Sequence, residues 1–257
     1  MELIDTHCHL TFEQLADDVQ AVVARSIAAG VLGWLTVGTD PQQNRKAIEL
    51  ADKFENMYAA VGIHPHDAKD LTADTLTELK ELAQSKKVVA IGETGLDFHY
   101  NFSNQSDQKR AFAAQLTIAK ELNLPVIIHC REAFDQTMEI LAQHGRGLKG
   151  VVFHCFGGSA RQAKIVLDYG FYISFTGVVT FKNADITRQA AEIVPVDRLM
   201  LETDCPYMSP EPMRKQNINE PALMLHTAKY LAELKGMALT DFANAVTTTS
   251  KTFFGLS

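Results

Sequence analysis

The sequence predicts an α/β fold, a single (β/α)8 TIM barrel. Eight short apolar runs alternate with helical segments along the 257 residues. Several of these runs are continuously apolar, as in a parallel sheet that is covered by helices. Eight such units in about 250 residues match the size of this barrel. An open doubly wound sheet is the alternative, but no GxGxxG or GxxxxGKS phosphate loop follows an early strand.

The expected strands are short and apolar, and several are rich in β-branched residues. In chain order they are Leu3–Thr6, Gly33–Gly38, Met57–Gly62, Lys87–Glu93, Pro125–His129, Gly150–His154, Phe171–Phe175 and Arg198–Thr203. Their regular spacing, with no linker or low-complexity tract between them, predicts one domain over residues 1–257.

The expected helices lie between and after these strands. They are Phe12–Ala29, Gln42–Glu55, Thr72–Gln84, Gln105–Leu122, Ala133–Gln143, Ala160–Tyr169, Ala184–Ile193, Ala222–Lys235 and Thr240–Phe254. Gly30 ends the first helix, and Thr72 is a suitable N-cap for the third. Two longer loops are expected at Thr94–Asn104 and Pro206–Glu220.

The chain is acidic, with a net charge of −7 and a pI near 5.7. Such a chain is a poor candidate for gripping duplex DNA without regard to sequence, because that needs a basic surface. An enzyme that holds a strand end through a few Arg or Lys residues and bound metals is still compatible. Met1–Asp5 carries acid where a signal peptide is positive, and no apolar run reaches the roughly 18 residues of a membrane helix. We therefore expect a cytoplasmic protein with no membrane contact.

The four cysteines each lie beside a candidate metal ligand. They are Cys8, Cys130, Cys155 and Cys205. No CxxC pair is present, so neither a zinc knuckle nor a thioredoxin-type site is supported. Neighbours on a strand point to opposite faces, so the cysteines should turn toward the helices when the ligands turn inward. We expect them to pack as small apolar residues.

Residues of the types that bind metals lie where five of the predicted strands end. They are His7, His9, Glu93, His129, His154 and Asp204. In a TIM barrel the ends of the strands carry the chemistry. A single histidine there is often only a hydrogen-bonded structural residue, but four with two carboxylates are harder to explain in that way.

The spacing suggests a pair of divalent metals. His7 and His9 are two residues apart on an extended segment, so both can reach one cation, and Asp204 can complete that site. His129 and His154 come from adjacent strands and can hold a second cation, with Glu93 as the bridge. Two metals about 3.5–4 Å apart can polarise a phosphoryl or carbonyl oxygen and activate water. Asp204 is the expected proton acceptor.

The chain resembles the TatD family of metal-dependent deoxyribonucleases, within the amidohydrolase superfamily. The matching stretches run through the whole sequence in the family's order. They are IDTHCHL from Ile4, GIHPHD from Gly62, GETGLDFHY from Gly92, LPVIIHCREA from Leu124, FHCFGGS from Phe153, SFTGVVTFKNA from Ser174 and LETDCPYMSP from Leu201. The resemblance implies a TIM barrel, and the family's metal ligands match the six residues above one for one.

The resemblance also implies a reaction. Members are divalent-metal hydrolases, and some are 3′-to-5′ exonucleases on DNA, so we expect phosphodiester hydrolysis at single-stranded DNA or 3′ ends. The metal could be zinc, manganese or magnesium, and the histidines favour the first two over an all-oxygen magnesium site. The alternative is an ester or amide hydrolase such as a D-aminoacyl-tRNA deacylase. A barrel that binds metal without catalysis is the third possibility. No obligatory protein partner is evident.

The chain departs from the family pattern in one loop. After Arg214 the family usually has Gly-Lys-x-Asn-x-Pro, whereas here the run from Lys215 to Pro221 is one residue longer and lacks the glycine. The path of this loop, and so its contacts with substrate, is the part that the resemblance leaves open.

Four further polar residues are candidates for the site. His64 is expected near the substrate, and Arg131 and Arg214 are candidates to hold a phosphate, with structural salt bridges as the alternative. Glu202 is two residues before Asp204 and could orient a metal-binding histidine, with a buried ion pair as the alternative.

Several aromatic residues could contribute through their rings. Phe98, His99, Tyr100 and Phe102 could stack on a base, or could simply be packed. Trp34 lies within a predicted strand and is expected in the core.

Overall fold

The computed structural model describes residues 1–256. The eight predicted strands are all present, and they follow one another in sequence order, β1 to β8, in one sheet. This order, with helices between the strands, is that of a (β/α)8 barrel and confirms the predicted fold class. The described residues divide into two compact units. Unit 1 comprises Met1–Thr36 and Cys155–Ser257, and unit 2 comprises Val37–His154. The single domain over residues 1–257 stays a prediction.

Unit 1 contains both ends of the chain. Its strands are β1 (Leu3–Cys8), most of β2 (Val31–Val37), β7 (Tyr172–Phe175) and β8 (Leu199–Leu201). Its helices are α1 (Glu13–Ala16), α2 (Val19–Ala28), α7 (Ala160–Asp168), α8 (Asp185–Ile193), α9 (Met224–Leu234) and α10 (Leu239–Phe254).

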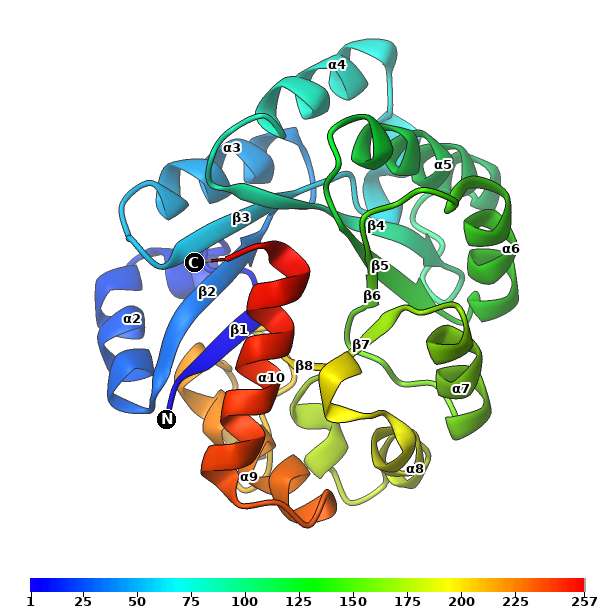
Figure 1. Ribbon diagram of the computed structural model, residues 1–257. Coiled ribbons are helices and arrows are strands. Elements are labelled where there is room, and N and C mark those ends of the chain that lie inside the picture. Colours follow the sequence, from blue (N-terminus) through cyan, green and yellow to red (C-terminus); the bar gives the residue numbers. More distant parts are fainter. Residues whose placement is uncertain (257) are drawn as a thin grey trace. The chain divides into compact units, whose positions relative to one another are not determined.

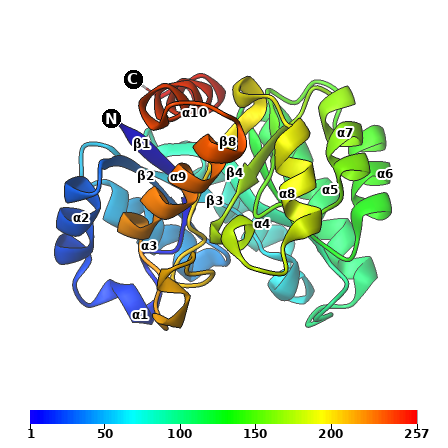
Figure 2. The same cartoon turned by 90° about the horizontal axis from the view of Figure 1, so that it is seen from below.

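The strands of unit 1 pair in parallel, and its helices cover them. β1 pairs with β2 and β7 with β8. The helix α10 packs on β1 and β8 (Figure 1), so the end of the chain covers its beginning. The helices α9 and α10 also pack against each other (Figure 2). Trp34 is buried as predicted, and its indole donates to Ser26 Oγ at 2.8 Å.

Unit 2 contains four α-helices and four strands that alternate along the chain. Its strands are β3 (Met57–Val61), β4 (Val88–Asp97), β5 (Val126–Arg131) and β6 (Val151–Phe153). Its helices are α3 (Pro41–Ala51), α4 (Ala73–Leu82), α5 (Gln105–Glu121) and α6 (Phe134–His144). β4 pairs in parallel with β3 and with β5, between which it lies (Figure 1). Thr72 is the N-cap of α4 through a capping box, as predicted.

Three strands run further than predicted, and this changes where the site residues lie. β1 continues to Cys8 and β5 to Arg131, so His7 and His129 lie inside strands rather than at their ends. β4 continues to Asp97, because Thr94–Asp97 pairs with Ile128–Arg131. The expectation of a loop from Thr94 was therefore wrong at its start.

The predicted helix Phe12–Ala29 is broken in two. The backbone of Asp18 leaves the helical region, and its carboxylate accepts from the Ala21 amide as the N-cap of α2. Short polar side chains compete in this way with helix continuation. A 3-10 helix at Pro65–Asp70 was not predicted, and another at Pro221–Leu223 delays the start of α9. No helix in the part of the chain that the structure describes could cross a membrane.

Candidate metal centre

Unit 1 brings three predicted ligands together as the His7 cluster, which consists of His7, His9 and Asp204. The backbone fixes their register. The Asp204 amide donates to His7 O, and the His9 amide donates to Cys205 O, both at 2.9 Å. Asp204 has a positive φ of 53°, which turns the chain sharply after β8. The carboxylate of Asp204 therefore faces the two imidazoles.

The donor atoms of the His7 cluster have the spacing of ligands around one cation. His7 Nε2 and His9 Nε2 are 3.3 Å apart, and they lie 3.8 and 3.5 Å from Asp204 Oδ1. Ligands at about 2.1 Å on the corners of a tetrahedron are about 3.4 Å apart. His7 is fully buried, whereas the Asp204 side chain is 13% exposed. The residues present thus fit one divalent metal, with the carboxylate at the open side.

Asp5 supports this cluster from within β1, which sequence reasoning missed. Its carboxylate accepts from the Thr203 amide at 2.9 Å and from the Thr203 hydroxyl at 2.5 Å. It thereby fixes the residue next to Asp204. Burial raises the pKa of Asp5 to about 7, although the hydrogen bonds from Thr203 oppose the rise. The alternation of β1 offered a signal, since Asp5, His7 and His9 share one face.

Unit 2 contains the Glu93 cluster, which consists of Glu93, His64, His129 and His154. One oxygen, Glu93 Oε1, lies 2.6 Å from His129 Nδ1, 2.7 Å from His154 Nε2 and 3.4 Å from His64 Nε2. The Nε2 atoms of His64 and His154 both lie 3.3 Å from His129 Nδ1. A carboxylate among three imidazoles is a donor set for zinc or manganese, so these residues also fit a divalent metal.

The charges of the Glu93 cluster are strongly coupled. Burial alone would raise the pKa of Glu93, but His154, His64 and His129 outweigh burial and hold this pKa well below its usual value. Burial would lower the pKa of His129, but Asp97 and Glu93 raise it. For His64 burial wins and lowers the pKa to about 4. His129 thus holds a proton in this cluster more readily than His64.

Asp97 is the main residue that sequence reasoning missed in unit 2. Its Oδ2 lies 3.2 Å from His129 Nε2 and 2.9 Å from His66 Nε2. Burial would raise its pKa, but the hydrogen bonds from His129, the Tyr100 amide and His66 lower it instead. A carboxylate behind a metal-binding histidine fixes the orientation of the ring and raises its basicity. Continuing the strand past Glu93 would have placed Asp97 on the same face.

Glycine at position 95 allows β4 and β5 to approach each other beside this cluster. A Cβ atom there would lie 2.0 Å from His129 O, and the φ of Gly95 is 142°. Only glycine fits both conditions. The position of the backbone that carries His129 therefore depends on the absence of a side chain at position 95.

The structure shows what Glu202, Arg131 and Arg214 contact, while their roles stay predictions. Glu202 is buried, and its two oxygens accept from the Cys155 amide at 2.6 Å and from Ser174 Oγ at 2.5 Å. Arg131 is exposed, with its guanidinium 4.7 Å from the centre of the Tyr100 ring. Arg214 is exposed and lies 3.7 Å from the centre of the Phe181 ring.

The cysteines are all free thiols, as expected. Cys8 and Cys205 are fully buried, which confirms their role as packing residues. Burial and a hydrogen bond with Cys205 raise the pKa of Cys8. Cys130 and Cys155 are only half-buried, so the prediction of buried packing was wrong for these two. Burial raises the pKa of Cys130 to about 11, which makes it a poor nucleophile.

The loop after β8 is anchored at both of its ends despite its departure from the family pattern. The Glu211 amide donates to Thr180 Oγ1 at 2.8 Å. The buried Asn219 side chain donates to Thr203 O at 3.0 Å and to Tyr207 O at 2.6 Å. Glu220 accepts from Arg25 through both carboxylate oxygens. Between these anchors, residues 215–218, which depart from the family pattern, are exposed.

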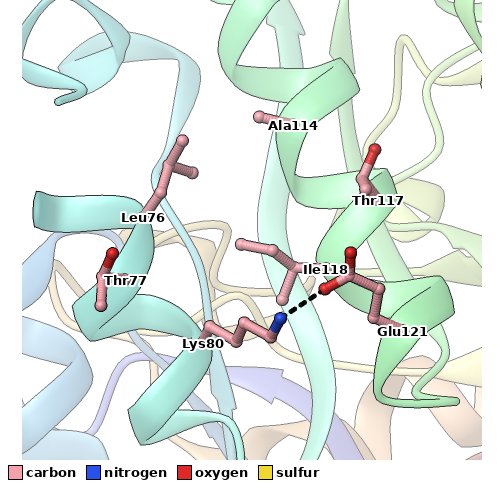
Figure 3. A pocket seen from close by; sticks show the side chains of 7 residues that line it. All are labelled: Leu76, Thr77, Lys80, Ala114, Thr117, Ile118 and Glu121. Carbon is pink, nitrogen blue, oxygen red and sulfur yellow. Dashed lines mark ion pairs between the residues drawn. The ribbon is translucent and has the colours of Figure 1, made fainter. Parts of the chain in front are cut away.

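A cleft of about 320 Å³ lies between α4 and α5 on the helical side of unit 2. Figure 3 shows Leu76 and Ile118 lining it and an ion pair between Lys80 and Glu121 across it. Both charged side chains are 48% exposed, and no histidine is among the lining residues. The cleft therefore lacks a group of histidines and carboxylates like those of the two clusters.

Comparison with known proteins decides the family. A model of the TatD-related DNase family matches residues 4–255. The chain belongs to this family. It is 42% identical over 255 residues to the uncharacterized metal-dependent hydrolase YabD of Bacillus subtilis, covering 99% of this chain and 100% of that protein. It is 37% identical over 259 residues to the 3′-5′ ssDNA/RNA exonuclease TatD of Escherichia coli K12, with the same coverage.

Solved structures of TatD proteins have the same fold. The TatD homologue YJJV of Escherichia coli K12 matches with a TM-score of 0.92 and 31% identity, covering 99% of this chain and 98% of that one. A hydrolase of the TatD family from Entamoeba histolytica matches with a TM-score of 0.92 at 24% identity, covering 100% and 99%. Membership of the TatD family confirms the predicted resemblance and the enzyme class, a metal-dependent hydrolase.

Proposed function

We propose that this chain is a divalent-metal-dependent exonuclease that removes nucleotides from the 3′ end of single-stranded DNA. The observation that carries the proposal is the presence of two donor sets, the His7 cluster and the Glu93 cluster, each suited to a divalent cation. The name of the Escherichia coli relative, a 3′-5′ ssDNA/RNA exonuclease, supports the substrate class and the polarity.

The proposal assigns one cation to each cluster. His7, His9 and Asp204 would hold the first, and His129 and His154 with Glu93 the second, while the bridging role of Glu93 is kept from the sequence prediction. Bound divalent metals supply a Lewis acid for the phosphoryl oxygen and lower the pKa of water. The imidazole content favours zinc or manganese over magnesium. Neutralisation of phosphate charge by cations also explains how an acidic chain can act on a polyanion.

The side chains of the protein would orient the substrate and move the proton. Asp204 is the proposed proton acceptor, because its carboxylate is partly open to solvent while His7 is not. Arg131 and Arg214 are exposed cations, and their planar guanidinium groups suit phosphate oxygens. We place His64 near the substrate, although its contact with Glu93 brings it close to the metal donors. Glu202 is proposed to act indirectly, by orienting a metal-binding histidine.

One assay set tests the proposal. Bound metal is measured by elemental analysis, and single-stranded DNA labelled at the 3′ or the 5′ end is incubated with and without chelator. We expect the 3′ label to be lost at once and the 5′-labelled strand to shorten stepwise. Chelator should stop both. A D-aminoacyl-tRNA is assayed in parallel. Deacylation without shortening of DNA would instead establish an ester hydrolase, and bound metal without either reaction would indicate a non-catalytic barrel.

The substitution Asp204→Asn separates proton transfer from metal binding. We expect turnover to be abolished while bound metal is retained or modestly reduced, because the amide can still offer an oxygen but cannot accept the proton. Unchanged turnover would remove Asp204 from this role.

We also propose that the protein works in the cytoplasm. Its four cysteines are free thiols, which is the usual state in a reducing compartment. No protein partner is part of the proposal.

A further inference from the structure

Two large aromatic side chains of unit 2 are exposed next to the Glu93 cluster. Tyr100 is 48% exposed and Phe102 is 60% exposed. Their rings are parallel to within 10°, with centroids 5.4 Å apart. Neighbouring exposed apolar rings can bind a ligand, because hiding them from water is favourable. We call this pair the aromatic platform.

The platform is fixed to the Glu93 cluster by Asp97. Asp97 Oδ1 accepts from the Tyr100 amide at 2.9 Å and from the His99 amide at 3.0 Å, while Asp97 Oδ2 lies 3.2 Å from His129 Nε2. One carboxylate thus holds both the turn that carries Tyr100 and the imidazole that contacts Glu93. The position of the platform relative to His129 is therefore built into the fold of unit 2.

A second link runs through His66. Its ring meets both members of the platform edge-on, with centroids 5.6 Å from Tyr100 and 4.8 Å from Phe102. Its Nε2 atom lies 2.9 Å from Asp97 Oδ2. The contact with His66 thus restricts the motion of both rings, so little conformational entropy is lost when a flat ligand binds.

The chemistry around the platform identifies the ligand. The Arg131 guanidinium lies 4.7 Å from the centre of the Tyr100 ring and comes from β5, two residues after His129. Aromatic rings beside an arginine bind single-stranded nucleic acids, since bases stack on the rings and the cation meets the backbone. A protein partner would not need both an arginine and a metal-binding cluster beside its contact surface.

We propose that Tyr100 and Phe102 form a stacking platform for a nucleobase at the end of the substrate strand. The inference rests on the proposed function, because it takes single-stranded nucleic acid as the substrate. Stacking depends on the π face that all bases share, so the platform would hold the strand end with little preference for sequence. It would place the terminal nucleotide by its base while Arg131 contacts phosphate.

The test compares two oligonucleotides that differ only at the 3′-terminal residue. One ends in a normal nucleotide and the other in an abasic sugar. Steady-state cleavage by the metal-loaded wild-type enzyme is compared with that by Tyr100→Ala, Phe102→Ala and the double variant. For wild type, loss of the base should raise KM roughly tenfold, within the range measured for stacking of one base. For the double variant, the two oligonucleotides should have equal KM values.

The platform is overturned if the double variant binds the normal oligonucleotide as wild type does, or still discriminates against the abasic end. Tyr100→Phe keeps the ring and should behave as wild type. Tyr169→Ala is the matched control, because Tyr169 is 50% exposed and belongs to unit 1. Thermal unfolding of each variant shows whether the fold is intact.

A binding measurement separates this inference from the proposed function. The affinity of a 5′-fluorescein-labelled single-stranded oligonucleotide is followed by anisotropy with the same proteins. If no cleavage is found but the double variant binds roughly tenfold more weakly than wild type, the platform stands and the exonuclease proposal falls. If cleavage is found and both proteins bind equally, the platform falls and the exonuclease proposal stands.

Discussion

The two clusters hold similar side chains in different ways. In the His7 cluster the donor atoms are 3.3–3.8 Å apart, and the Asp204 carboxylate is 13% exposed. In the Glu93 cluster the Glu93 carboxylate is only 4% exposed, and its Oε1 lies 2.6 Å from one imidazole and 2.7 Å from another. The His7 cluster is therefore the more open of the two, whereas the donor atoms of the Glu93 cluster lie closer together around one buried oxygen. Because the pKa of His129 is raised, a metal that binds the Glu93 cluster competes with a proton on this imidazole.

The largest effect is expected from Glu93→Gln. This change removes the carboxylate among three imidazoles, and with it the proposed bridge between the two cations, so we expect loss of metal from the Glu93 cluster and a fall in kcat/KM of about a thousandfold or more. Elemental analysis and the DNA assay measure the two effects. Glu121→Gln on α5 is the control, because Glu121 is exposed and pairs only with Lys80 on the surface. Retention of full metal content would show that the carboxylate is not a ligand.

The second prediction tests how far the stability of unit 2 depends on the close approach of the β4 and β5 backbones. Gly95→Ala should lower the free energy of unfolding by about 4 kcal/mol, because the new Cβ would meet His129 O and must also adopt a positive φ. Gly147→Ala has the same conformational problem with open space around the Cβ, so it should cost about 1–2 kcal/mol. Denaturant unfolding measures both. Equal losses for the two variants would rule out the close contact as the cause.

A third prediction concerns pH and the support of the His7 cluster. The pKa of Asp5 is about 7 in the folded chain and 3.8 in the reference state, so the folded state holds this proton more tightly. That contribution to stability is present below pH 3.8 and is lost as pH rises toward 7. Asp5→Asn removes the ionisation, so the stability of the variant relative to wild type should increase by about 3 kcal/mol between pH 4 and 7.

This third prediction is measured by urea unfolding of chelator-treated protein over that pH range. A stability difference that does not change with pH would mean that Asp5 does not titrate there. Asp97→Asn should show the opposite sign when the same titration is extended below pH 3.8. The pKa of Asp97 is lowered in the fold, so its contribution is present at neutral pH and is lost on acidification.

The smallest effect is expected from Asp97→Asn at neutral pH. Loss of the charge behind His129 should weaken metal binding by about 10–100-fold, as is usual for residues that orient a metal-binding histidine. The loss should be confined to one of the two proposed cations. Competition with a coloured chelator measures each affinity. If the affinities of both cations fell together, the two clusters would not act as separate binding units.

Sequence reasoning predicted the fold because each strand carries its own apolar signal. It also singled out the six side chains that the structure gathers into the two clusters, since histidines and carboxylates next to such strands are visible without coordinates. It missed Asp5 and Asp97 for one reason. Asp5 acts through a hydrogen bond with Thr203, and Asp97 acts through its contact with His129. Both partners are distant in sequence, so they can be found only when the register of the strands is known. The break at Asp18 was missed because a cap competes locally with a favourable helical pattern.

The loop after β8 is anchored at both ends, and this makes the position of Asp204 independent of the sequence of residues 215–218. Its front is tied to Thr180 through Glu211, and its end is tied to Thr203 through Asn219, so the position of Asp204 does not depend on residues 215–218. Insertions or deletions in those residues should thus be tolerated while the chemistry next to them is kept. Evolution, or a designer who grafts other sequences there, can therefore vary this surface without rebuilding the His7 cluster.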